Sequence, residues 1–111
     1  MSQAEQMDDT PQWFVMRDLK RSNAKLPAYR MLEEMNIRCF TPMVTRILVR
    51  HGKRERRLLP FLPDLLFVFD TRGTLDPIVG SVPTFQYRYQ KGRVPMTVRQ
   101  ADMERFIRAV S

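Results

Sequence analysis

The side chains best able to do chemistry in this chain are the cations gathered in the segment RILVRHGKRERR, residues 46–57. They stand against a single acid, Glu55. Guanidinium and ammonium groups at this density neutralise phosphates and release counterions, an interaction that is strong, salt-sensitive and largely independent of base sequence. A charged edge that only prevents aggregation between strands would have the same composition. The cations are Arg46, Arg50, Lys53, Arg54, Arg56 and Arg57.

A β-hairpin turning at His51-Gly52 is the element that must position these cations. The pattern predicts two arms, residues 44–50 and 54–59, joined by a loop at 51–53. We therefore expect the hairpin to bind nucleic acid through its phosphates.

The run Leu-Leu-Phe-Val-Phe at residues 65–69 is apolar at every position. A strand sends alternate side chains to opposite faces, so positions 65, 67 and 69 face one way and positions 66 and 68 the other. Exposing either apolar face to water is unfavourable, so we expect each face to be packed against other residues. In one interpretation the chain's own helices and loops cover both faces; in the other, one face lines a pocket for another protein. Periodicity alone does not choose between them.

Catalytic chemistry is poorly provided for. The chain has one His and one Cys, and it lacks the motifs of zinc proteases, serine hydrolases and phosphate-cradling glycine loops. His51 lies in the cationic turn, where an exposed turn residue that could contact phosphate is a simpler interpretation than a catalytic one. Cys39 is most simply a small buried apolar group. We expect a protein that is not an enzyme and needs no metal, no other cofactor and no small-molecule substrate.

Length and charge bound the class of protein. A chain of 111 residues is one domain with a single modest core. A net charge of +7 favours a polyanionic partner such as nucleic acid. One cysteine allows no internal disulfide, and the apolar runs are far shorter than the about 20 residues that span a bilayer. We therefore expect a cytoplasmic protein with no membrane partner.

The remaining chain predicts an α+β domain. Strands are expected where short apolar or alternating runs occur, and helices where apolar residues recur at i, i+3, i+4 and i+7. The first helix would be capped by Ser22 or Asn23, and the last by a capping box at Thr97 and Gln100. Pro77 and Gly80 would limit a short helix to residues 74–79. The predicted strands are 13–16, 37–41, 65–69, 85–89 and one near Val94, and the helical stripes are Ala28, Met31, Leu32, Met35 and Met103, Phe106, Ile107, Val110.

The order of these pieces, over about residues 12–110, resembles the N-terminal (NGN) domain of NusG-family transcription elongation factors. The strongest part is the segment PFLPDLLFV, residues 60–68. The nearest similarity is to specialised paralogues of the RfaH and UpxY kind. The other matching pieces are Trp13-Phe14-Val15, the first helix, Phe40-Thr41-Pro42-Met43, the basic hairpin, Ser81-Val82-Pro83 and the terminal helix.

This resemblance implies an antiparallel β-sheet flanked by helices, an α/β sandwich with a protruding basic hairpin. The domain would span residues 12–111 after a disordered leader at 1–11, with no KOW domain in the chain. It also implies a hydrophobic depression that receives the clamp-helix coiled coil of the largest RNA polymerase subunit. The family's contact positions fall on Leu62, Leu65 and Phe67, and Tyr89 would complete the depression.

The resemblance also implies contacts with DNA of the transcription bubble. The loop around Lys20, Arg21 and Asn23 corresponds to residues that touch the non-template strand in the specialised paralogues. A domain docked this way would suppress pausing or termination, which makes it an elongation or antitermination factor. The complete set of expected nucleic-acid contacts is Lys20, Arg21, Asn23, Arg50, Lys53, Arg54, Arg56 and Arg57.

The chain departs from the family pattern in two places. The usual Phe-Pro-Gly-Tyr is here Leu62-Pro63-Asp64-Leu65, which loses two aromatics and places an acid at the turn, and a His-Thr-Thr motif is replaced by residues 72–74, Arg-Gly-Thr. Two other functions fit the residues. One is a free-standing RNA- or DNA-binding module with a basic hairpin and a sheet that stacks bases on Phe85, Tyr87 and Tyr89. The other is a structural protein of the ribosome.

Overall fold

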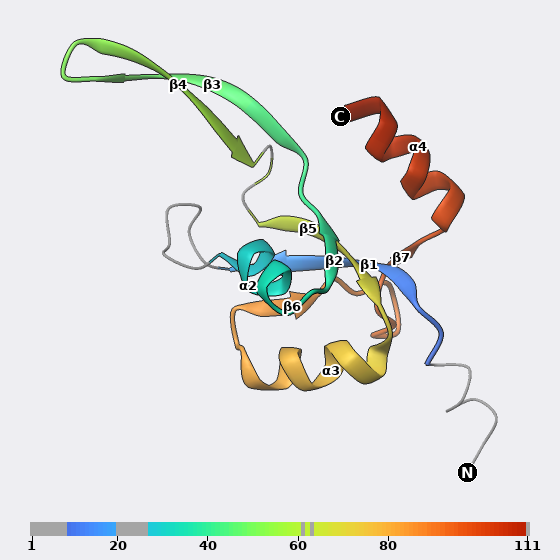
Figure 1. Ribbon diagram of the computed structural model, residues 1–111. Coiled ribbons are helices and arrows are strands. Elements are labelled where there is room, and N and C mark those ends of the chain that lie inside the picture. Colours follow the sequence, from blue (N-terminus) through green and yellow to red (C-terminus); the bar gives the residue numbers. More distant parts are fainter. Residues whose placement is uncertain (1–8, 20–26, 61, 63, 111) are drawn as a thin grey trace.

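The computed structural model describes residues 9–19, 27–60, 62 and 64–110 (Figure 1). Within them, one antiparallel sheet and a separate two-stranded hairpin are accompanied by three helices, which confirms the predicted α+β class. Most of the predicted leader lies outside these residues. The sheet consists of β1 (Gln12–Asp18), β2 (Arg38–Phe40), β5 (Leu65–Asp70), β6 (Phe85–Tyr87) and β7 (Thr97–Val98); the hairpin is β3 (Met43–Arg50) and β4 (Lys53–Pro60); the helices are α2 (Ala28–Glu34), α3 (Arg72–Ser81) and α4 (Gln100–Val110).

Strand β1 is the centre of the sheet. The strand order is β2-β5-β1-β6, and β7 also pairs with β1. Strand β5 lies along one edge of β1, with Trp13 opposite Phe69 and Arg17 opposite Leu65, while β6 and β7 share the other edge. Because β1 has a neighbour on each side and layers above and below it, its residues 13–16 are all buried.

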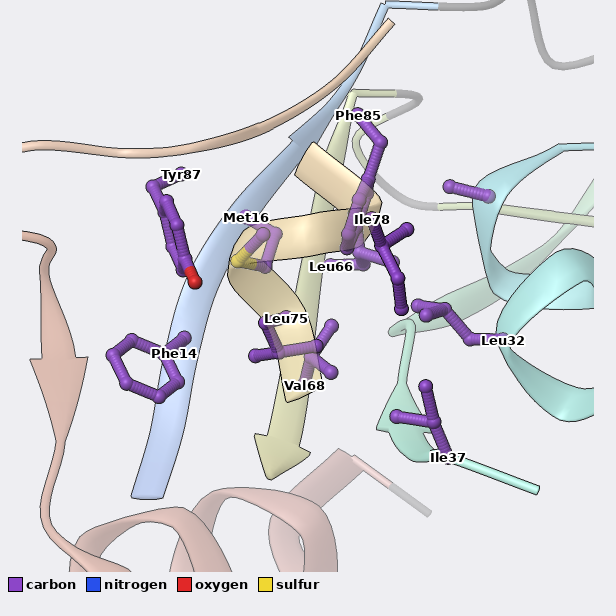
Figure 2. Close-up of a cluster of buried hydrophobic side chains, with 11 residues drawn as sticks. Phe14, Met16, Leu32, Ile37, Leu66, Val68, Leu75, Ile78, Phe85 and Tyr87 are labelled. Atoms are coloured by element: carbon purple, nitrogen blue, oxygen red, sulfur yellow. The ribbon is translucent and has the colours of Figure 1, made fainter. Parts of the chain in front are cut away.

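One face of the sheet, here called the core face, is covered by α2 and α3. Met16 of β1 and Leu66 of β5 point into this core, where they meet Leu32 from α2 and Leu75 from α3 (Figure 2). These side chains are almost completely buried, so this cluster supplies most of the hydrophobic stabilisation of the domain. The buried members are Phe14, Met16, Ala28, Leu32, Ile37, Leu66, Val68, Leu75, Ile78, Phe85 and Tyr87.

The opposite face, here called the open face, is covered only in part. Helix α4 lies on it and places the Phe106 ring 5.6 Å from Phe67 and 6.0 Å from Phe40, measured between ring centroids. Trp13 and Phe69 pair on the same face at 5.3 Å. Figure 1 shows α4 and the β3–β4 hairpin rising on one side of the sheet, with α3 on the other. The predicted sandwich of helices around a sheet is therefore present.

Helix α2 begins later than predicted. Its N-cap residue is Pro27, which provides no side-chain cap, so the cap expected at Ser22 or Asn23 is wrong; both residues lie outside the described part of the chain. A side chain from β1 takes over the role, because Asp18 Oδ2 accepts a hydrogen bond from the Ala28 N–H at 2.8 Å. The carboxylate thus satisfies a backbone donor that the helix itself leaves unpaired.

The other two helices also differ from the predicted bounds. Helix α3 extends through Pro77 over ten residues, because the burial of Leu75 and Ile78 offsets the about 3 kcal/mol cost of an internal proline. The predicted capping box at residues 97–100 is wrong, because Thr97 is in β7 and pairs with Phe14. Sheet pairing therefore takes the residues that would have capped α4.

Candidate docking face and nucleic-acid interface

The basic hairpin has a two-residue turn. Eight residue pairs run from Met43 opposite Pro60 to Arg50 opposite Lys53, which places Lys53 in β4 and not in the loop. His51 and Gly52 have φ angles of 52° and 75°. Positive φ at both central residues matches the twist of the flanking strands, and it sets this register.

The register places like charges directly opposite each other on the hairpin. Arg46 faces Arg57, and Arg50 faces Lys53. Opposed like charges destabilise a strand pair, and the ion pair of Arg57 with Glu55, at 3.8 Å, offsets only part of this. A polyanion would neutralise the repulsion, so the arrangement favours phosphate as a partner.

The second face of the hairpin combines cations with apolar side chains. Arg54 and Arg56 lie here beside Ile47, Val49 and Leu58, and the three apolar residues are 58–69% exposed. The hairpin projects away from the sheet (Figure 1), and all the expected hairpin contacts, Arg50, Lys53, Arg54, Arg56 and Arg57, are exposed to solvent.

The expected docking residues are only partly brought together. Leu65 and Phe67 share the open face, both half-buried. Leu62 is 46% exposed and lies in the adjoining turn, where its carbonyl accepts a hydrogen bond from the Leu65 N–H at 3.1 Å. Tyr89 follows β6, on the other side of β1 from Leu65, and its ring lies against Tyr87 at 6.2 Å.

Sequence reasoning missed two aromatic members of the open face. Phe40 joins it through strand pairing with Phe67, and Phe106 through the packing of α4. The apolar stripe of the terminal helix was the available signal for Phe106, although the stripe does not say which sheet face it covers. Together with Leu65 and Phe67, these rings make an apolar surface whose members are each partly exposed.

Base stacking on the β6 aromatics is not available. Phe85 is completely buried and Tyr87 nearly so, which contradicts the sheet-stacking alternative for these two residues. The Tyr87 hydroxyl donates a hydrogen bond to Asp76 Oδ1 at 2.6 Å. Burial raises the pKa of Tyr87, and the hydrogen bond to Asp76 raises it further. Tyr87 is therefore a fixed structural residue.

The described residues show no other chemical centre. No three His, Cys, Asp or Glu side chains among them are grouped to hold a metal ion. No helix in the same part of the chain is long and apolar enough to cross a membrane.

A family model described as "Transcription termination factor nusG" matches residues 11–107, from the start of β1 through most of α4. The chain belongs to the NusG family. No curated protein gives a significant match. Proteins of the NusG family are non-enzymatic factors of transcription elongation and termination that interact with RNA polymerase. The family prediction is confirmed, and the relation to RfaH- and UpxY-like paralogues stays a prediction.

The sequence of this NusG-family domain predicts DNA contacts at Lys20, Arg21 and Asn23. All three residues lie outside the described part of the chain. The structure does describe both ends of the loop. Asp18 is buried and joined to Ala28 by a hydrogen bond, and the Leu19 N–H donates to the Thr84 carbonyl at 2.7 Å. Asp18 and Ala28, on either side of the undescribed residues, are therefore next to each other beside the sheet.

Proposed function

We propose that this NusG-family protein is a transcription elongation or antitermination factor that docks on the clamp-helix coiled coil of the largest RNA polymerase subunit. The observation that carries the proposal is the unequal burial of β5. Leu66 and Val68 are 2% and 0% exposed, whereas Leu65 and Phe67 on the other face are partly exposed. The open face therefore has apolar area that the domain itself does not bury.

The composition of the open face suits a protein partner. Aromatic and aliphatic side chains at the centre of a patch, with charged residues at its margin, are typical of protein interfaces. Phe40, Phe67 and Phe106 form such a centre, and Leu62 and Leu65 extend it. A coiled coil offers a rigid helical surface that buries area here without a large ordering cost.

The hairpin supplies the contact with upstream or non-template DNA. Its cations are exposed, and the opposed pairs Arg46–Arg57 and Arg50–Lys53 favour a phosphate-bearing partner. Lys20, Arg21 and Asn23 belong to the same proposal as a second contact with the non-template strand. Because these groups read phosphates, DNA affinity depends steeply on salt. Docked on polymerase and DNA together, the domain would sustain elongation by suppressing pausing or termination.

The experiment is calorimetric titration of the purified clamp-helix coiled coil into the protein. Leu65→Asp is expected to weaken binding by about 30-fold or more, because it places a charge in an apolar contact worth about 2 kcal/mol. Phe67→Ala is expected to act in the same direction. Leu58→Asp is the control, since Leu58 is a leucine of the hairpin, outside the open face, and is more exposed than Leu65. Equal binding by wild type, Leu65→Asp and Phe67→Ala would refute the docking assignment.

A further inference from the structure

Three charged side chains converge at one end of the open face. Arg17 ends the apolar part of β1, Asp64 immediately precedes β5, and Arg88 follows β6. The Arg17 Nη2 lies 4.0 Å from Asp64 Oδ2, and the Arg88 Nη2 lies 3.8 Å from the same oxygen. All three side chains are partly exposed. Two guanidinium groups therefore share one carboxylate at the surface.

This cluster is continuous with the docking residues. Arg17 is the strand partner of Leu65. The Arg88 N–H donates to the carbonyl of Val15, which is itself opposite Phe67. The charged cluster and the apolar centre are therefore neighbouring parts of one surface.

Asp64 leaves N–H donors of Arg17 and Arg88 without a close acceptor. Both N···O distances exceed the about 3.2 Å limit of a good N–H···O hydrogen bond. The Arg17 Nε is buried and finds no hydrogen-bond partner among the described residues. Ion pairs at this exposure contribute little to stability, so they are readily exchanged. The cluster keeps a surplus positive charge and free N–H groups.

A groove of about 430 Å³ lies beside these donors. Its wall includes Arg17, Arg88 and the exposed Tyr89. The groove is open to solvent at the edge of the docking surface, so a side chain from a docked partner has room to enter. Its lining residues are Arg17, Gln86, Tyr87, Arg88, Tyr89 and Met96.

We propose that Arg17 and Arg88 form an anion clamp that receives an acidic side chain of the docked coiled coil. The planar guanidinium fork matches a carboxylate in a bidentate arrangement. A carboxylate on a protein is favoured over a phosphate because the clamp adjoins the aromatic centre of the open face, whereas the hairpin carries its cations on a separate sheet. The inference rests on the proposed docking function and adds what orients the partner on this face.

Asp64 is the residue that tunes this clamp. Its carboxylate competes with the incoming acid for the same two guanidinium groups. Removing that charge is therefore expected to strengthen docking, although it removes a native ion pair. This sign is opposite to the result of a merely damaged fold, which makes Asp64→Asn the most informative variant.

The test is calorimetric titration of the clamp-helix coiled coil into the whole chain at two salt concentrations. Arg17→Gln and Arg88→Gln are each expected to weaken binding about tenfold, and Asp64→Asn to strengthen it about threefold. Wild-type affinity is expected to fall more steeply with salt than the affinity of a double variant that combines Arg17→Gln with Arg88→Gln. Arg30→Gln is the matched control, because Arg30 is an exposed arginine on α2, which covers the core face.

The outcomes separate this inference from the proposed function. If Arg17→Gln, Arg88→Gln and Asp64→Asn bind like wild type while Leu65→Asp does not, docking stands and the clamp is refuted. If Leu65→Asp also binds like wild type, the docking function itself fails. A parallel titration with a single-stranded oligonucleotide refutes the protein-carboxylate assignment if only oligonucleotide binding is lost in the arginine variants.

Discussion

The two faces of β5 present nearly the same side-chain types to different surroundings. On the core face, Leu66 and Val68 are sealed beneath α2 and α3. On the open face, Leu65 and Phe67 remain partly exposed, and Phe67 packs against Phe106 of the terminal helix. A strand needs one apolar face to fold onto a core, so the second face exceeds what folding requires. The difference shows that the core face is the more completely buried one, and it is consistent with the proposed docking on the open face.

The two faces of β5 are expected to differ most in how much each contributes to the free energy of unfolding. Leu66→Ala is expected to lower the free energy of unfolding by about 2–5 kcal/mol, because it leaves a cavity in a closed core. Leu65→Ala is expected to cost less than about 1.5 kcal/mol, since its side chain is already partly in water. Urea denaturation of both variants measures the difference. Equal losses would show that the two faces are not distinct.

Phe106 of helix α4 tests how completely this helix covers the open face. Phe106→Ala removes the ring that contacts both Phe40 and Phe67, and it is expected to cost about 1–2 kcal/mol because Phe106 is itself partly exposed. Thermal unfolding measures this loss. A loss as large as that of Leu66→Ala would mean that α4 seals the open face and leaves no docking surface.

The hairpin is expected to trade stability for DNA affinity. Arg46→Glu places an acid opposite Arg57, so the protein is expected to gain a few tenths of a kcal/mol in stability. The same change is expected to weaken binding to a short DNA duplex and to reduce the salt slope of the affinity by about 1 to 2. Arg56→Glu is the matched control, because Arg56 faces Ile47. It should weaken DNA binding without the stability gain, and an equal gain in both variants would contradict the register argument.

The last prediction concerns Cys39, in β2 at the edge of the sheet. Burial raises the pKa of its thiol from 9.0 to about 11, and the nearby charge of Glu33 adds to the shift. The unfolded chain therefore releases this proton at lower pH than the folded one, and stability is lost as pH rises from about 9 to about 11. Denaturation midpoints at pH 8 and 10 for wild type and Cys39→Ala measure this. A midpoint difference that does not change with pH would contradict the shift.

Local patterns predicted the parts of the fold that depend on neighbouring residues. The alternation of β5 follows from the two-residue period of a strand, and the hairpin turn follows from the His51-Gly52 pair. Long-range pairing explains the errors. Thr97 looks like a helix cap until β7 is known to pair with β1, and Asp18 caps α2 from ten residues away.

The docking surface was predicted less completely than the fold. Leu65 and Phe67 could be placed on one face from sequence, but Phe40 and Phe106 reach that face only through the packing of β2 and α4. The Arg17–Asp64–Arg88 cluster joins three strands, so no local pattern contains it. Charges that meet in this way can be recognised only when the register of the sheet is known.

The most direct test of the account is to map the contact surface of the clamp-helix coiled coil by amide NMR titration. The largest chemical-shift changes are expected in β5 around Leu65 and Phe67, at the adjoining residues Arg17 and Arg88, and in α4 near Phe106. The amide signals of α2 and α3, which cover the core face, are expected not to shift. Shifts confined to α2, α3 or the hairpin tip would contradict the claim that the open face is the docking site.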